Sequence, residues 1–241
     1  MTTSASVRVL LAAGVALTTA CKPTQSEMLK TALQLTIERD ASYDLVGERL
    51  AHDGSLFVAL PVTERLVALS VEYRADLEMW PDSNRKEAVA RMMKRIDNEQ
   101  VFVVVISAGD FEVQPGEISL VNDSKQESVP ATTTSPALQS KVAEEHVARG
   151  FVTFPRTTDE GDLTYALRIP HSINTGAFYT SDAGHSILQF DNTELDILKM
   201  VEKGLDEDEI RDRLGIDWDV SGSDVRRVAD AAIAVLQILA K

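Results

Sequence analysis

Apolar and polar positions alternate along much of the chain between residues 28 and 170, which predicts a region built mainly of β-strands. Residues 32–38 (ALQLTIE) and 66–73 (LVALSVEY) show the period of two that is typical of half-buried strands. Residues 101–106 (VFVVVI) form a nearly continuous β-branched run, which indicates a strand covered on both faces. Shorter apolar segments predict further strands at residues 56–60, 117–121, 150–154 and 163–169. Turn residues separate these segments, so we expect an antiparallel sandwich.

One helix interrupts the predicted strands. Ser83 or Asn84 can cap its start, and an apolar stripe follows at helical spacing. The stripe consists of Val89, Met92, Met93 and Ile96. The outer face carries the densest positive patch of the chain, made of Arg85, Lys86, Arg91, Lys94 and Arg95. We interpret this face as solvated; the alternative is an interaction face for envelope phosphates or an acidic partner.

Residues 122–141, which are rich in Ser, Thr and Pro, predict either a long loop or a partly disordered insertion. From residue 171 onward the pattern changes. Residues 177–180 and 186–190 predict a small hairpin. Three helices are then expected, from Asn192 or Thr193 to Gly204, over residues 206–214 and over residues 224–239.

A short apolar run opens the chain, and its layout is typical of an export signal. Arg8 supplies a positive charge, and residues 9–17 form the apolar middle. Thr18 and Ala20 then place small residues at positions −3 and −1 before Cys21. We therefore expect export, with residues 1–20 removed.

Residues 7–21 resemble a bacterial lipoprotein signal, in which the cysteine thiol receives a diacylglyceryl group. The resemblance implies lipid attachment at Cys21, a membrane anchor and residence in the cell envelope. The sequence departs from the usual pattern because Leu17 stands at −4 and Thr18 at −3. The alternatives are plain secretion and a cytosolic amino-terminal helix. Residues 21–27 are interpreted as a polar tether, residues 28–170 as one domain and residues 171–241 as a second.

The composition excludes some partners and one kind of cross-link. The net charge is −14, and residues 21–241 hold 38 acidic against 23 basic side chains, about −15. Such a surface repels nucleic acid and anionic lipid headgroups, so neither is an expected partner. A single cysteine permits no disulfide within the chain.

A stretch within residues 101–170 resembles secreted lipoproteins with an immunoglobulin-like domain. Residues 120–124 (LVNDS) take the place of the turn that ends one strand in that family, and residues 150–155 (GFVTFP) take the place of the closing strand. The usual glycine is missing at Lys125-Gln126. The resemblance implies an immunoglobulin-like β-sandwich with a binding or structural role, and it carries over no catalytic residue.

Residues 171–241, a hairpin followed by three short helices, look like a small winged-helix domain. Residues 195–216 resemble the first two helices of LuxR-type helix-turn-helix domains, but residues 217–223 then intervene where a basic recognition helix should follow. The longer loop is more similar to the PqqD-like peptide-carrier fold, as a fold analogy only. The whole chain is thus predicted to be α+β, a sandwich with one inserted helix followed by a winged-helix-like domain.

Residues 217–222 (DWDVSG) fit the opening of a calcium loop, in which oxygen ligands alternate before a turning glycine. The candidate ligands are Asp217, Asp219, Ser221 and Asp224. The twelfth position of the loop should supply a bidentate carboxylate, and it is Val228. Ca²⁺ is therefore the weaker hypothesis beside a capped acidic turn.

No catalytic motif stands out. The histidines at 52, 146, 171 and 185 lack metal-ligand spacing, and the serines lack the G-x-S-x-G context. A glycine-rich phosphate loop is also missing. We therefore expect a non-enzymatic envelope lipoprotein that needs no cofactor and binds or scaffolds a protein or peptide. A calcium or small-ligand binding protein is the alternative, and an enzyme with a site assembled from scattered acids is a remote third.

Overall fold

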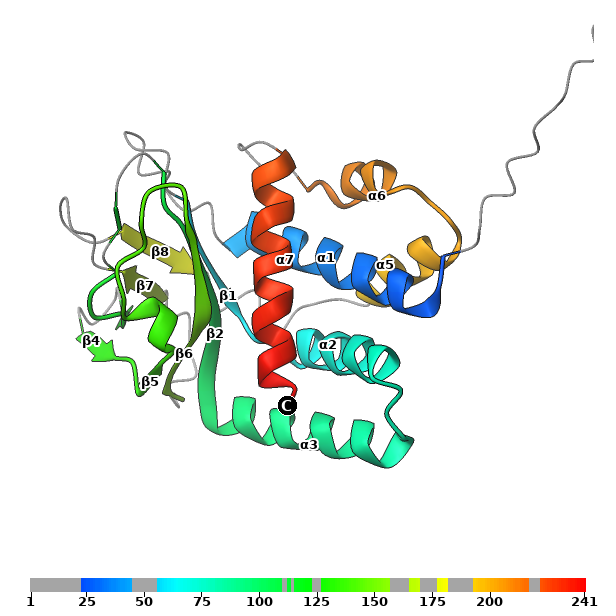
Figure 1. Ribbon diagram of the computed structural model, residues 1–241, viewed down its shortest axis with the longest axis horizontal. Coiled ribbons are helices and arrows are strands. Elements are labelled where there is room, and N and C mark those ends of the chain that lie inside the picture. Colours follow the sequence, from blue (N-terminus) through cyan, green and yellow to red (C-terminus); the bar gives the residue numbers. More distant parts are fainter. Residues whose placement is uncertain are drawn as a thin grey trace, which may run out of the picture.

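A four-stranded antiparallel sheet of order β1-β2-β6-β5 forms the centre of the molecule. The computed structural model describes residues 23–44, 56–109, 112–113, 115–122, 127–156, 165–169, 177–181, 193–216 and 222–241. The sheet consists of β1 (Leu56–Pro61), β2 (Glu99–Ser107), β6 (Val147–Pro155) and β5 (Thr133–Thr134). Figure 1 shows helices α1, α2 and α7 on one side of it and a smaller sheet on the other. The mixed α+β class is thus confirmed.

Strand β2 is buried along nearly its whole length. Every residue from 101 to 107 is buried, so the side chains on both faces of β2 are covered. Strand β2 pairs with β1 on one edge and with β6 on the other. A strand covered on both faces needs apolar side chains at consecutive positions. The prediction from VFVVVI is therefore confirmed.

The second sheet is also antiparallel and has the order β4-β3-β7-β8. Its strands are β3 (Ser119–Asn122), β4 (Glu127–Pro130), β7 (Tyr165–Ile169) and β8 (Ala177–Ser181). Buried Leu120 and Leu167 belong to the same hydrophobic cluster as β2, so the two sheets contribute to one core. The described part of the segment predicted as a loop, residues 127–141, contains β4, β5 and the 3₁₀ turn η1 (Pro136–Leu138).

The strand predicted at residues 32–38 is wrong, because these residues lie within helix α1 (Gln25–Asp44). Leu33 belongs to the hydrophobic cluster under the central sheet, whereas Leu35 belongs to a second cluster with the carboxy-terminal helices. A helix buried on opposite sides keeps only a narrow polar strip, here with Lys30 and Gln34, so its apolar residues do not follow the simple period of 3.6 that marks an amphipathic helix. The capping pair Thr24 and Glu27 starts this helix: Thr24 N donates to Glu27 Oε2 at 2.6 Å.

The strand predicted at residues 66–73 is also wrong, because helix α2 (Glu64–Leu77) covers this segment. Thr63 caps it, with its side chain accepting a hydrogen bond from Leu66 N at 3.3 Å. Its buried positions, Leu66, Val67, Ser70, Val71, Arg74 and Ala75, recur at helical spacing. The β-branched residues therefore fill a helix face here.

Helix α3 (Asp82–Asn98) is the inserted helix, and its existence is confirmed. Met92 is buried, and Val89, Met93 and Ile96 are partly buried against the core, as the apolar stripe predicted. The helix starts two or three residues earlier than expected, with Pro81 at the N-cap position in place of Ser83 or Asn84.

The three predicted carboxy-terminal helices are confirmed as α5 (Thr193–Glu202), α6 (Glu207–Leu214) and α7 (Gly222–Leu239). Gly204 and Gly215 follow α5 and α6 with positive φ angles of 78° and 64°. Buried residues of α5 and α6 form the second cluster together with α1, whereas α7 belongs to the cluster under the central sheet.

The hydrophobic core therefore crosses the boundary predicted at residue 170, and the division into two domains stays a prediction. Residues 186–190, the second strand of the predicted hairpin, lie outside the described residues. Residues 25–27, predicted as part of the tether, form the first turn of α1. Among the described helices, none combines the length and apolar character needed to cross a membrane.

Candidate functional site

Two hollows meet along α7, one lined by residues of β6 and α7 and the other by residues of α1, α7 and the start of α6. We name them jointly the charged groove. The first, of about 570 Å³, is lined by Val147, Arg149, Arg226, Arg227, Asp230 and Ala231. The second, of about 530 Å³, is lined by Gln34, Asp206, Glu207, Asp208, Arg226 and Asp230. Arg226 and Asp230 line both hollows, so the two are parts of one continuous surface.

The first hollow, the basic hollow, presents three arginines and one aspartate. Arg227 is held in place because its Nη2 donates a hydrogen bond to Ser107 Oγ at the end of β2, at 2.9 Å. Arg149 and Arg226 are exposed, and neither has an ion-pair partner among the described residues. Val147 and Ala231 line the same hollow and give it an apolar floor. This hollow offers positive charge beside a small apolar surface.

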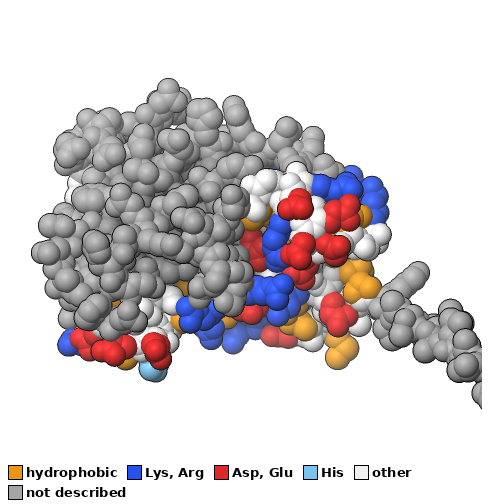
Figure 2. All heavy atoms as spheres, turned by 90° about the horizontal axis from the view of Figure 1, so that it is seen from above, with side chains coloured by type: hydrophobic (Ala, Val, Ile, Leu, Met, Phe, Trp, Pro, Cys, Tyr) orange, Lys and Arg blue, Asp and Glu red, His pale blue; other side chains and the backbone are white. Residues whose placement is uncertain are grey.

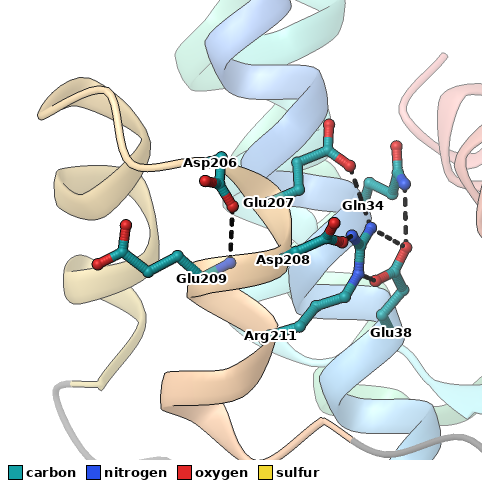
Figure 3. Close-up of polar contacts among 7 residues, drawn as sticks. All are labelled: Gln34, Glu38, Asp206, Glu207, Asp208, Glu209 and Arg211. Carbon is teal, nitrogen blue, oxygen red and sulfur yellow. Dashed lines mark hydrogen bonds and ion pairs between the residues drawn. The ribbon is translucent and has the colours of Figure 1, made fainter.

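The second hollow, the acidic hollow, presents four carboxylates and one arginine. Three of the carboxylates come from the start of α6, where negative charge is favoured by the helix dipole. Asp206 is the N-cap, and its Oδ1 accepts a hydrogen bond from Glu209 N at 2.8 Å (Figure 3). The acidic run is therefore explained by the N-cap and the helix dipole, and it also lines a surface hollow.

A buried ion pair fixes α6 against α1 and so positions the acidic hollow. Glu38 of α1 is fully buried, and Arg211 of α6 contacts both of its oxygens, at 2.7 Å from Nε and 3.2 Å from Nη2 (Figure 3). Gln34 also donates to Glu38, at 2.9 Å. The hydrogen bonds to Glu38 raise the pKa of Arg211 above its ordinary value. The guanidinium therefore stays charged at any working pH.

Arg211 also reaches the rim of the acidic hollow. Its Nη2 contacts Glu207 Oε2 at 3.0 Å, and its Nη1 contacts Asp208 Oδ1 at 2.9 Å. The Asp208 side chain is nevertheless 89% exposed. One arginine thus holds two carboxylates of the hollow in place and leaves part of their surface open to solvent.

Asp230 sits at the junction of the two hollows and forms an ion pair with Lys30 of α1, at 3.3 Å. Both side chains are about half exposed, so this pair is a weak surface contact. Figure 2 shows the face seen from above, where Lys and Arg side chains gather directly beside Asp and Glu side chains. Both signs of charge occur in each hollow, with arginines in the majority in the first and carboxylates in the majority in the second.

The predicted interaction face on α3 is used largely within the molecule. Arg85 pairs with Glu72 of α2 at 2.8 Å, and Arg91 Nη2 donates to the backbone oxygen of Lys241 at 2.6 Å. Arg95 lies over the Phe151 ring, 4.9 Å from its centroid.

Arg95 also pairs with Glu99 at 3.6 Å, while Lys94 is exposed. The structure thus places these four cations on one helix but engages three of them in holding α3 to its neighbours. The solvated-face interpretation fits Lys94 best.

The remaining predicted site residues fall mostly outside the described part of the chain. Cys21, Asp217, Asp219 and Ser221 all lie outside it, and Asp224 lies in the first turn of α7. The calcium loop therefore stays a prediction. Within the described ranges, no cluster of three His, Cys, Asp or Glu side chains could hold a metal ion.

Sequence reasoning missed the charged groove. One feature could have indicated it: Arg226 and Arg227 are the only adjacent basic residues in the acidic stretch 191–241. Their neighbours in the groove come from β6 and α6, and no spacing in the sequence links these segments.

Comparisons of the chain with protein-family models, with curated proteins and with solved structures gave no match. The chemistry of the site is therefore judged from its own residues. The groove offers exposed guanidinium groups in one hollow and carboxylates in the other. Such an arrangement can bind a ligand that carries both charges.

Proposed function

We propose that this chain is an exported, lipid-anchored protein of the cell envelope that binds a protein or peptide partner without catalysing a reaction. We infer the binding role from the charged groove, in which the basic hollow and the acidic hollow share Arg226 and Asp230. Exposed charges of both signs beside an apolar floor are typical of the polar rim of a recognition surface.

The anchor part of the proposal is supported by residues 7–21. An apolar segment behind Arg8, small residues at −3 and −1 and a cysteine directly after them fit a lipoprotein signal. Two or three acyl chains on Cys21 would hold the protein at a membrane, because each buried methylene adds to membrane affinity. The acidic surface would then favour partners other than anionic lipid or nucleic acid.

The scaffold part of the proposal is an immunoglobulin-like sandwich. Two antiparallel sheets that contribute to one hydrophobic core support it, together with the resemblance of residues 101–170 to secreted lipoproteins. The winged-helix-like relationship of residues 171–241 stays a prediction. In this proposal the sheets supply a rigid base, and α6 and α7 present the groove.

Site-specific crosslinking in the native cell tests the binding role. A photoreactive amino acid at position 149 or 208, on the two rims of the groove, should give a discrete adduct with a partner. The same amino acid at position 86, exposed on α3, is the control and should give none. Arg226→Glu should remove the adduct. Equal crosslinking from position 86 and from the groove would contradict a dedicated binding surface.

A further inference from the structure

The chemistry of the charged groove narrows the kind of partner it takes. We propose that it binds an extended peptide segment of a partner protein in which a carboxylate side chain and an ammonium side chain are two residues apart. This inference rests on the proposed function, because it assigns the ligand class of the same groove. Its first element is the basic hollow, where exposed Arg149 and Arg226 can both reach a carboxylate.

The second element is the acidic hollow, which receives the ammonium group. Its four carboxylates and the buried Glu38 behind them make five negative charges. They outnumber the three neighbouring cations Arg226, Arg211 and Lys30, although Arg211 also contacts Glu207 and Asp208 and Lys30 pairs with Asp230. Asp208 is almost fully exposed and Asp230 is about half exposed, so both remain reachable from solvent. A ligand cation in this hollow would meet an excess of negative charge at short range.

The spacing of the two charges follows from α7. Arg226 and Asp230 stand four residues apart, which places them on successive turns of one helix face, about 6 Å from each other. In an extended peptide, side chains two residues apart lie on the same face with a separation of about 6.6 Å. A Glu-x-Lys or Lys-x-Glu segment therefore matches the separation, whereas adjacent charges would point to opposite faces.

The carboxylates also explain why a peptide is favoured over a phosphate group. A phosphate carries nearly two negative charges at neutral pH, and Asp230 lines the same hollow as the arginines. Asp206, Glu207 and Asp208 add further negative charge next to it. A single carboxylate suffers less from this repulsion, and an attached ammonium group converts the nearby acids into a favourable contact.

The test uses the full chain with Cys21→Ser, so that its outcome does not depend on lipidation. The probes are the blocked peptides acetyl-AEAKA-amide, acetyl-AQAKA-amide, acetyl-AEAQA-amide and acetyl-AEKAA-amide, and inorganic phosphate. Binding is followed by amide chemical shifts at residues 226–231 during NMR titration. We expect acetyl-AEAKA-amide to bind about threefold to fivefold more tightly than each other probe. This is the difference in affinity expected from the loss of one exposed charge contact.

Matched variants show whether the groove is responsible. Arg226→Glu and Arg149→Glu should each abolish the preference for acetyl-AEAKA-amide. Lys86→Glu makes the same change in net charge on α3 and should leave the preference intact. Since all three side chains are exposed, the fold should tolerate each change.

Several results would overturn the ligand class: phosphate binding more tightly than any peptide, equal binding of the four peptides, or an equal loss in Lys86→Glu. If the peptide preference fails while groove crosslinks persist in cells, the ligand class is wrong and the proposed function stands. If the crosslinks fail as well, the binding role of the groove is also wrong.

Discussion

Replacing Arg211 with leucine should destabilise the protein far more than replacing its neighbour Arg213. Arg211 contacts both oxygens of Glu38, a carboxylate with 0% exposed surface, and it joins α6 to α1. Leucine keeps part of the side-chain volume but removes the guanidinium. The substitution therefore removes the cation that contacts both oxygens of a buried carboxylate.

Removing one partner of a buried ion pair typically costs 3–5 kcal/mol in the free energy of unfolding. Gln34 still donates a hydrogen bond to Glu38, so we expect the lower end, about 3 kcal/mol. For a chain of this length that corresponds to a fall in Tm of about 6–12 °C. Arg213 pairs with Glu209 one turn apart on the same helix, but both side chains are about half exposed. Arg213→Leu should therefore cost about 0.5 kcal/mol.

Urea denaturation followed by circular dichroism measures both values, with Arg213→Leu as the matched control. The double variant Glu38→Leu/Arg211→Leu should recover much of the loss, because it removes the buried charge together with its partner. Equal costs for Arg211→Leu and Arg213→Leu would refute the reasoning, since they would mean that the Glu38 contact adds nothing to the stability of the fold.

Three further predictions follow from single contacts. Gly150→Ala would place a Cβ atom 2.5 Å from Ser135 Cβ, so thermal melting should show a loss of about 2 kcal/mol. Asp206→Ala removes the N-cap bond of α6 and should cost about 1 kcal/mol in urea denaturation. A hydrogen bond from Arg74 lowers the pKa of Glu78 below its ordinary 4.5, so this carboxylate stabilises the fold above that pH and ceases to do so as the pH falls. Glu78→Gln should therefore be less stable than the parent chain at pH 7, and the difference in Tm should vanish near pH 2.

The local pattern of apolar and polar residues correctly predicted those strands and helix ends that depend on few other parts of the fold. Residues 101–106 lie between layers that cover both faces of β2, so their continuous apolar run indicated the correct structure. The N-cap of α6 and the glycines that follow α5 and α6 depend on neighbouring residues only, so Asp206, Gly204 and Gly215 are recognisable from the sequence.

The errors arose where a helix is surrounded by other elements. Leu33 and Leu35 of α1 point into different clusters, so apolar positions recur on both sides of the helix. In residues 32–38 this produces an alternation that resembles a strand. The helical period is present in α2, at Leu66, Val67, Ser70 and Val71, but residues 66–73 also alternate between apolar and polar, which indicates a strand.

The groove could not be predicted because its residues come together only in the folded chain. Arg149 lies on β6, Asp206 precedes α6 and Arg226 lies on α7. The ion pair between Glu38 and Arg211, which positions α6, joins residues 173 positions apart. In the sequence, Arg226 and Arg227 stand out only as an adjacent basic pair. That pair does not indicate which carboxylates will lie near it in the folded chain.

The intact mass of the membrane-extracted protein tests the central claim, that this is a lipid-anchored binding protein. The account predicts a chain that starts at Cys21 and carries the added mass of a diacylglyceryl group, with or without a further acyl chain. In the Cys21→Ser variant this mass should be missing and the protein should leave the membrane fraction. A parent chain that starts at an unmodified Cys21, or one that retains residues 1–20, would contradict the account.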